Sequence, residues 1–351
     1  MNEFPNNENV EQNPENINNS NKPKLINKYI ELHFHLDGSI TVDIAKKLAS
    51  LQNIVLPTDN DSELESLLSV PDNIHNLEDI FKCFALPLSL LQTPKGLTEA
   101  VRLVADNIQS LGVIYTEFRF APQLHTNKGM TQEDAIKAAL EGIKLTSLKV
   151  NLILCIMRGK DNQTENELTL ELAKKYLVKD GGVVAIDLAG DELNYKTYEY
   201  KSLFEKAREY KIPFTIHAGE VDGPESVKAA IEFGAKRIGH GIRACEDQNI
   251  IELLRVKEIP LEICPTSNKI TQAIGNMVNY PVMDFLLKGL KVTLSTDDMG
   301  IERTNIIKEF NYLEQNFNLT YEQKKTILIN SIDAAFTTDE VKAKLRDVLG
   351  F

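Results

Sequence analysis

From residue 25 onward, short apolar runs alternate with longer stretches of helical period. Runs of four to eight apolar or β-branched residues are typical of buried strands, and apolar residues at i, i+3, i+4 and i+7 indicate one face of a helix. Helical stretches lie between the runs, for example at 41–52, 131–144, 165–176 and 225–233. The eight expected strands are 29–35, 113–120, 150–157, 183–188, 213–217, 237–240, 261–264 and 291–295.

Eight strands, each followed by a helix, predict an α/β protein with a closed (β/α)8 TIM barrel. A doubly wound open sheet is the competing fold, but it often carries a glycine-rich first turn, and no GxGxxG follows the first strand here. About 75 residues separate the first two strands, far more than one helix needs. We therefore expect extra helices inserted after the first strand, at the mouth of the barrel.

The first 24 residues differ in composition from the rest of the chain. They are rich in Asn and Glu, contain several prolines and have few large apolar residues. Such a segment cannot bury enough apolar surface to fold, so we expect a disordered tail at 1–24. No further linker is visible, and residues 25–351 are expected to form one barrel domain.

The amino-acid composition disfavours some classes of binding partner. The 351 residues carry a net charge of −12, which disfavours nucleic acid and anionic membranes as partners. No apolar stretch reaches the length of a membrane span, and the first residues do not form a signal peptide. Four scattered cysteines without a CxxC pair suit a reducing compartment, and we expect a cytoplasmic protein.

An apolar stripe lies inside the long insertion. Leu77, Ile80, Phe81 and Phe84 follow helical spacing and mark one face of a helix. That face can pack into the core, or it can form a hydrophobic lid over a pocket, and the sequence alone leaves both interpretations open.

Histidines gather at the ends of the expected strands. Of the six in the chain, His33 and His35 end the first strand, His217 ends the fifth and His240 ends the sixth. Alternate residues of a strand point the same way, so His33 and His35 can face one metal. Strand ends meet at the face where TIM barrels build active sites, and a shared site is therefore the better interpretation of the four histidines.

The chemistry of these residues suits zinc. Three neutral imidazoles and one carboxylate can hold Zn²⁺ and leave a position for a water molecule, whose pKa the ion lowers. Glu220 lies three residues past His217, where it can exchange a proton with a substrate. Asp297 and Asp298 close the last strand and can divide the roles of binding metal and binding substrate.

Six motifs together resemble the adenosine deaminase family, in order and in spacing, over about residue 25 to the C-terminus. Each motif alone is a weak or moderate signal, whereas six in order are strong. They are ELHFHLDGS at 31–39, VVAIDLAGDE at 183–192, HAGE at 217–220, GHG at 239–241, EICPTSN at 262–268 and STDD at 295–298.

The resemblance implies a zinc-dependent hydrolase that converts adenosine, and also 2′-deoxyadenosine, to inosine and ammonia in purine salvage. In such enzymes a zinc-bound hydroxide attacks C6 of the purine, so Glu220 would protonate N1 and His240 would orient the hydroxide. Asp298 would contact the hydroxide side and N7. The matching zinc ligands, for one ion per chain, are His33, His35, His217 and Asp297.

The resemblance also implies the substrate contacts and a monomeric chain. Gly190 matches the glycine whose N–H meets purine N3, and Asp37 matches the carboxylate near the ribose 5′-hydroxyl. The full set of expected substrate-binding residues is His35, Asp37, Gly190, Asp298, Leu77, Ile80, Phe81 and Phe84.

Several alternatives remain from related and unrelated classes. Adenine deaminases tend to read HLEG, and N6-substituted AMP deaminases HLNG, where this chain reads HLDG at 35–38. Binuclear amidohydrolases commonly have a lysine after the fourth strand, but this chain has none there, and the PCxxC signature of cytosine-type deaminases is missing. A non-catalytic binding protein on the same barrel is disfavoured because every expected ligand and Glu220 are present.

Overall fold

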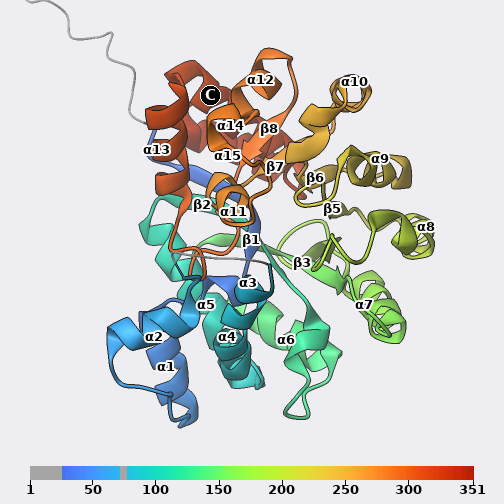
Figure 1. Ribbon diagram of the computed structural model, residues 1–351. Coiled ribbons are helices and arrows are strands. Elements are labelled where there is room, and N and C mark those ends of the chain that lie inside the picture. The colour runs from blue at the N-terminus through green and yellow to red at the C-terminus, as the bar shows by residue number, and fades with distance from the viewer. Residues whose placement is uncertain (1–25, 72–76) are drawn as a thin grey trace, which may run out of the picture.

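Eight parallel strands form the centre of the computed structural model, which describes residues 26–71 and 77–351 (Figure 1). The expected tail at 1–24 lies outside the described residues. Buried apolar residues fill most positions of the strands, as expected when both faces of a parallel sheet are covered. The strands are β1 (Tyr29–His35), β2 (Val113–Phe120), β3 (Lys149–Met157), β4 (Val183–Ala189), β5 (Thr215–Ala218), β6 (Arg237–His240), β7 (Leu261–Ile263) and β8 (Val292–Leu294).

The strands close into a barrel. β1 to β4 pair in chain order, and so do β5 to β8. Two bridges join these halves, one from Phe34 to Asp297 and one from Ile186 to Phe214. At the first junction the His35 N–H donates to the carbonyl of Asp297 at 3.0 Å. Together with structural relatives described below, this arrangement confirms the expected TIM barrel.

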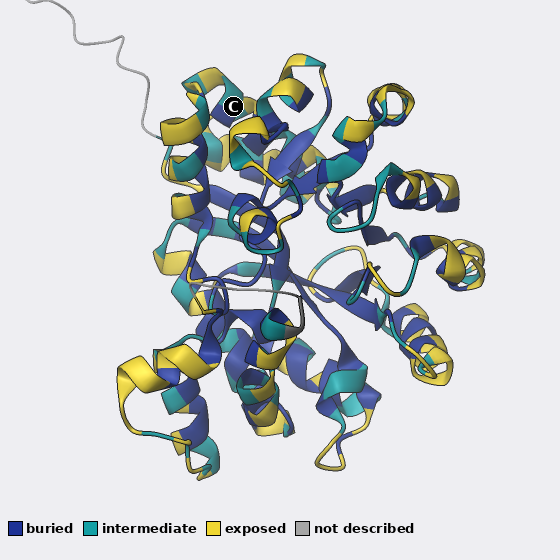
Figure 2. Cartoon of the chain, in the orientation of Figure 1, coloured by how far each residue is buried: buried dark blue, intermediate teal, exposed yellow. Residues whose placement is uncertain are grey.

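Helices surround the barrel, with exposed residues on their outer sides and buried ones towards the strands (Figure 2). This matches the helical period of the apolar positions in the sequence. The helices are α1 (Val42–Gln52), α2 (Asp61–Leu68), α3 (Leu77–Cys83), α4 (Ala85–Leu90), α5 (Pro94–Ser110), α6 (Gln132–Ile143), α7 (Gln163–Tyr176), α8 (Lys201–Glu209), α9 (Pro224–Phe233), α10 (Gln248–Lys257), α11 (Pro265–Ile270), α12 (Val282–Leu287), α13 (Ile306–Phe317), α14 (Tyr321–Ala334) and α15 (Asp339–Leu349).

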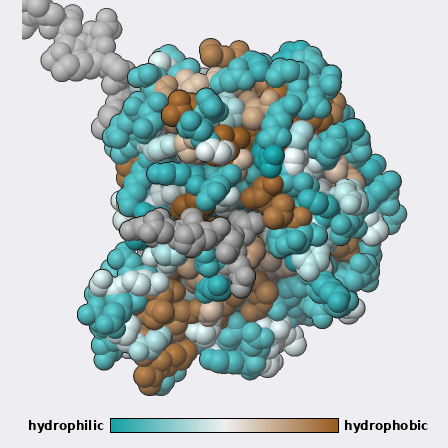
Figure 3. Space-filling view, in the orientation of Figure 1, coloured by the Kyte–Doolittle hydropathy of each residue, from teal (hydrophilic) through white to brown (hydrophobic). Residues whose placement is uncertain are grey.

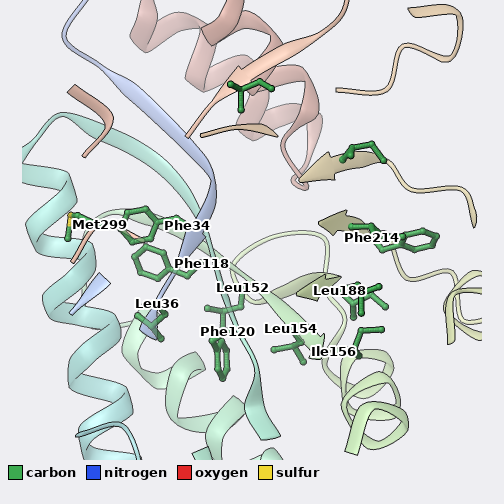
Figure 4. Close-up of a cluster of buried hydrophobic side chains, with 14 of the residues drawn as sticks. Phe34, Leu36, Phe118, Phe120, Leu152, Leu154, Ile156, Leu188, Phe214 and Met299 are labelled. Atoms are coloured by element: carbon green, nitrogen blue, oxygen red, sulfur yellow. The ribbon is translucent and has the colours of Figure 1, made fainter. Parts of the chain in front are cut away.

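Alternate residues of each strand point to opposite sides of the barrel wall, and the two sides differ in polarity. Phe34, Phe118, Leu154 and Leu188 come from four strands and pack towards the helices (Figure 4). The residues between them point the other way and include charged side chains, among them Arg119, which is fully buried. The barrel interior is therefore partly polar, and the apolar core lies between barrel and helices.

The insertion after β1 contains extra helices, as expected, but the apolar stripe does not lie on one continuous helix. α3 ends at Cys83, and Phe84 lies between α3 and α4. Pro87 has no N–H to donate to the Cys83 carbonyl four residues earlier, so one continuous helix is disfavoured. Proline is tolerated in the first turn of α4, where such a donor is not needed.

The surface is mostly hydrophilic on the face seen in Figure 3, with separate hydrophobic patches. Within residues 26–71 and 77–351, no helix has the length and apolar content that crossing a membrane requires.

Candidate active site

The predicted site residues lie together at the carboxyl ends of the strands. β1 carries His33 and His35, β5 carries His217, and β6 ends at His240. Asp297 follows β8 and adopts a left-handed backbone with φ of 71°, and His240 does the same with φ of 58°. Such conformations are uncommon for non-glycine residues and gather at functional sites, so both residues are held in place by their surroundings.

Four of these residues form a group that fits a metal ion. One ligand atom from each of His33, His35, His217 and Asp297 lies within 4.8 Å of the others. The His35 and His217 Nε2 atoms are 3.2 Å apart, and Asp297 Oδ1 lies 3.3 Å from His33 Nε2 and 3.4 Å from His35 Nε2. A tetrahedral ion with ligands at about 2.0–2.1 Å needs ligand separations of about 3.3–3.4 Å. The donors are therefore already spaced for such an ion.

Buried carboxylates orient two of the imidazoles. Glu262 Oε2 lies 2.7 Å from His33 Nδ1, and Asp187 Oδ2 lies 2.9 Å from His217 Nδ1. The hydrogen bond to Glu262 fixes Nδ1 of His33 as the protonated nitrogen and leaves its Nε2 free to bind a metal. The nearby Asp187 carboxylate favours the same tautomer of His217. The Nε2 atom of His33 is buried and makes no hydrogen bond within the described part of the chain, which also supports the fit of a metal.

The charge states of His35 and Asp297 suit a cation as well. Burial lowers the pKa of His35 well below its usual value, so this imidazole is neutral and can act as a ligand. Burial would raise the pKa of Asp297, but neighbouring His33 and His240 lower it well below its usual range. Asp297 is therefore an anion at neutral pH.

A cavity of about 280 Å³ opens next to this group. This volume is just below the range of about 300–1,000 Å³ that is typical of small-ligand pockets. Asp37 and Asp298 line it, and each has a buried Oδ1 atom without a hydrogen-bond partner among the described residues. Gly38 makes room for Asp298, because a Cβ atom at Gly38 would lie 1.6 Å from Asp298 Oδ1. Both carboxyls are thus available to a ligand.

Glu220 and His240 are neighbours in the wall of the cavity. The distance from Glu220 Oε2 to His240 Nε2 is 3.6 Å. Burial raises the pKa of Glu220 to about 8, and the charges of Asp297 and Glu192 raise it too. Glu220 therefore carries a proton at neutral pH and can donate it. Burial lowers the pKa of His240 well below its usual value, so its imidazole is neutral.

Asn268 sets the orientation of the His240 ring. Its Nδ2 atom lies 3.0 Å from His240 Nδ1, and its Oδ1 atom accepts a hydrogen bond from the Tyr280 hydroxyl at 2.8 Å. Because the amide donates to Nδ1, the proton of the neutral imidazole lies on Nε2. That N–H points towards Glu220 and towards Asp297, whose Oδ2 is 3.6 Å away.

Four more of the predicted site residues line the same cavity. Ile80, Phe81 and Phe84 line it, and so does Gly190, which has a positive φ of 97° just after β4. Ile80 is buried against Val70 and thus serves both the core and the cavity wall. Leu77 begins α3, but its side chain lies outside the described residues.

Some cavity residues were not predicted as site residues. Glu192 and Ser267 are part of the quoted motifs, whereas Met157 ends β3 and Glu302 follows the last motif. The signal for the first two was present, since polar residues directly after buried strands point to a site at that barrel face. No comparable signal marks Met157 or Glu302.

Comparisons with known proteins agree with this geometry. The sequence profile described as Adenosine deaminase matches residues 29–350. An adenosine deaminase from Haemophilus ducreyi is 46% identical over 322 residues, which cover 90% of this chain and 94% of that protein. An adenine deaminase from Arthrobacter aurescens has the same fold, with a TM-score of 0.82 at 24% identity over 92% of this chain and 98% of that one. An arabidopsis N6-mAMP deaminase has a TM-score of 0.79 at 28% identity over 93% and 98%. The profile match spans nearly the whole chain, and this chain therefore belongs to the adenosine deaminase family.

Proposed function

We propose that this protein hydrolyses adenosine, and also 2′-deoxyadenosine, to inosine or deoxyinosine and ammonia, with one zinc ion per chain. One observation carries the proposal: three members of the four-residue group spaced for a metal ion line the same small cavity as a protonated carboxyl, Glu220. When bound, zinc supplies Lewis-acid activation of a water molecule for addition to the purine. We expect the chain to act as a monomer.

The charge of the cavity favours a neutral nucleoside over a nucleotide. Among the described residues that line it, none is Lys or Arg, and residues 72–78 contain neither in their sequence. A 5′-phosphate carries about −1.5 to −2 charges at pH 7 and needs cationic partners. Carboxyl groups line the cavity instead, and the ionised one at Asp297 would repel a phosphate; the six are Asp37, Glu192, Glu220, Asp297, Asp298 and Glu302.

Glu220, His240 and Asp298 have different roles in proton transfer and in orienting the reacting groups. Glu220 donates its proton to purine N1, which makes C6 more electrophilic and ready for water to add. His240, with its proton on Nε2, orients the attacking oxygen and stabilises the charge that develops on it. Burial and the charge of Asp297 raise the pKa of Asp298 well above its usual range, so Asp298 can donate to purine N7.

A substrate assay on metal-analysed protein tests the proposal. We expect one zinc per chain and an ultraviolet change from adenosine to inosine that a chelator abolishes and added zinc restores. Adenine and AMP, assayed in parallel, should react at least about 100-fold more slowly, because a site built to pair specific polar groups discriminates strongly. Turnover of adenine or AMP alone, or none of the three with zinc bound, would contradict the proposed substrate.

Asp37→Ala should reduce kcat/KM for adenosine about 10- to 100-fold and leave the metal content unchanged. A hydrogen bond to a charged group is worth about 1.5–3 kcal/mol, and Asp37 has a buried free acceptor in the cavity. Asp43→Ala, an exposed aspartate in the first turn of α1, is the matched control and should change little.

The substrate 5′-deoxyadenosine identifies the partner of Asp37. If Asp37 accepts from the 5′-hydroxyl, wild-type enzyme should disfavour this analogue by a similar factor, and Asp37→Ala should cost nothing further with it. If Asp37→Ala lowers kcat/KM equally for both nucleosides, Asp37 does not bind the 5′-hydroxyl. If the metal content falls, Asp37 instead helps to hold the metal ligands in place.

A further inference from the structure

One buried carboxylate holds the loop that carries Glu220. Glu192 Oε1 accepts from the Gly219 N–H at 2.6 Å, and its Oε2 accepts from the N–H groups of Glu220, Val221 and Asp222 at 3.0, 3.0 and 3.1 Å. Four successive backbone donors therefore converge on a single side chain. Such a concave row of N–H groups is a typical binding site for an anion.

The carboxylate and the loop depend on each other. Glu192 is 2% exposed, and burying a charge is costly unless hydrogen bonds replace its hydration. Ser226 Oγ donates a fifth bond at 2.5 Å, so both oxygens are fully used. Bonds to an ionised acceptor are roughly twice as strong as neutral ones. The loop conformation is thus tied to the charged form of Glu192.

A second contact anchors the end of β5, directly before this loop. Arg158 Nη2 donates to the carbonyl of His217 at 2.5 Å and to Thr197 Oγ1 at 2.9 Å. Thr197 Oγ1 lies 2.6 Å from Ser226 Oγ, which also donates to Glu192. Side-chain hydrogen bonds therefore join the segment after β4 to the segment after β5. Within this set, Glu192 is the side chain that accepts from the backbone N–H of Glu220.

We propose that Glu192 is a positioning residue, which fixes the backbone at Glu220 so that the carboxyl of this acid is aimed at N1 of the bound purine. This inference rests on the proposed function. The negative charge of Glu192 also contributes, after burial and Asp297, to the raised pKa of Glu220. Glu192 thus holds the backbone of Glu220 in place and adds a smaller contribution to the raised pKa of this acid.

Glu192→Gln tests this role. The amide keeps one acceptor oxygen but turns an NH2 group towards backbone N–H donors, so the loop has to shift. We expect kcat for adenosine to fall about 100-fold, since a misplacement of about 1 Å can cost that factor. KM should stay within about threefold and the metal content should not change. The alkaline limb of kcat/KM should move to lower pH, because one negative charge near Glu220 is gone.

Two further variants make the result specific. Glu192→Asp keeps the charge on a shorter side chain and should recover part of kcat and the position of the alkaline limb. Glu199→Gln makes the same chemical change on an exposed residue of the same segment and should leave kcat within about threefold. If Glu192→Gln does not fold, Glu192→Asp is compared with wild type instead, and the same three quantities are measured: kcat, KM and metal content.

Three results would overturn the inference. These are a kcat of Glu192→Gln within threefold of wild type, a loss of turnover that tracks a loss of metal, and a rise in KM as large as the fall in kcat. Wild-type enzyme is the reference in each assay. A wild type that does not deaminate adenosine contradicts the proposed function itself, whereas an active wild type with unaffected Glu192 variants contradicts only the positioning role.

Discussion

Replacing Glu220 with Gln should lower kcat/KM for adenosine about 10²- to 10⁴-fold, the range that one general acid contributes. The amide is close in shape to the protonated carboxyl but cannot give up a proton to purine N1. Glu220 lies outside the four-residue metal group, so the variant should keep its metal. The structural change is small, and the loss should therefore appear in turnover and not in stability.

The same role of Glu220 predicts how kcat/KM depends on pH. Burial, with the charges of Asp297 and Glu192, raises the pKa of Glu220 to about 8. The acid is protonated below that pH and loses its proton above it, so wild-type kcat/KM should fall on the alkaline side. The Gln variant has no such group, and its residual activity should lack this limb.

Steady-state kinetics from pH 6 to 10, with metal analysis of each sample, measure both effects. Glu225→Gln is the matched control, since it makes the same change at a glutamate whose side chain is 78% exposed at the start of α9. Normal turnover in the Glu220→Gln variant, or an unchanged alkaline limb, would remove Glu220 from the mechanism.

The sequence predicted the barrel well because its signals are local. The strands 29–35, 113–120 and 237–240 agree with β1, β2 and β6 to the residue. The expected strand 213–217 instead begins at Thr215 in β5, because Pro213 has no N–H for a ladder bond and Phe214 contributes only a bridge. Strand ends are also the places where site residues gather in this fold, which is why the candidate residues lie around one cavity.

The residues that hold the site residues in position could not be predicted in the same way. Glu192 was part of a motif, but its backbone partners lie 27 to 30 residues further along the chain. Glu262 and His33 are 229 residues apart. Such pairs depend on barrel closure and on which face of each strand turns inwards, and periodicity within one segment does not determine either.

Another fully buried support is Arg119 on β2. Its guanidinium donates to Asp187 Oδ2 at 2.8 Å, to Glu262 Oε2 at 2.9 Å and to the Leu32 carbonyl at 2.7 Å. Burial alone would lower its pKa, but the charges of Glu262 and Asp187 raise it, so Arg119 stays cationic. Asp187 and Glu262 are the same carboxylates that hold His217 and His33.

Arg119→Met should therefore lower the free energy of unfolding by about 3–5 kcal/mol, because it leaves the buried Asp187 carboxylate without its arginine and leaves Glu262 with Arg237 alone. Urea titrations of chelator-treated protein measure this without the stabilisation that a bound metal adds. Arg102→Met is the control: Arg102 pairs with Glu99 and Asp106 on the surface, where an ion pair contributes about 0–1 kcal/mol. The Arg119 variant should also bind zinc more weakly, since the carboxylates that orient two ligands lose their anchor. Equal stability losses in the two variants would mean that the buried network adds nothing beyond a surface pair.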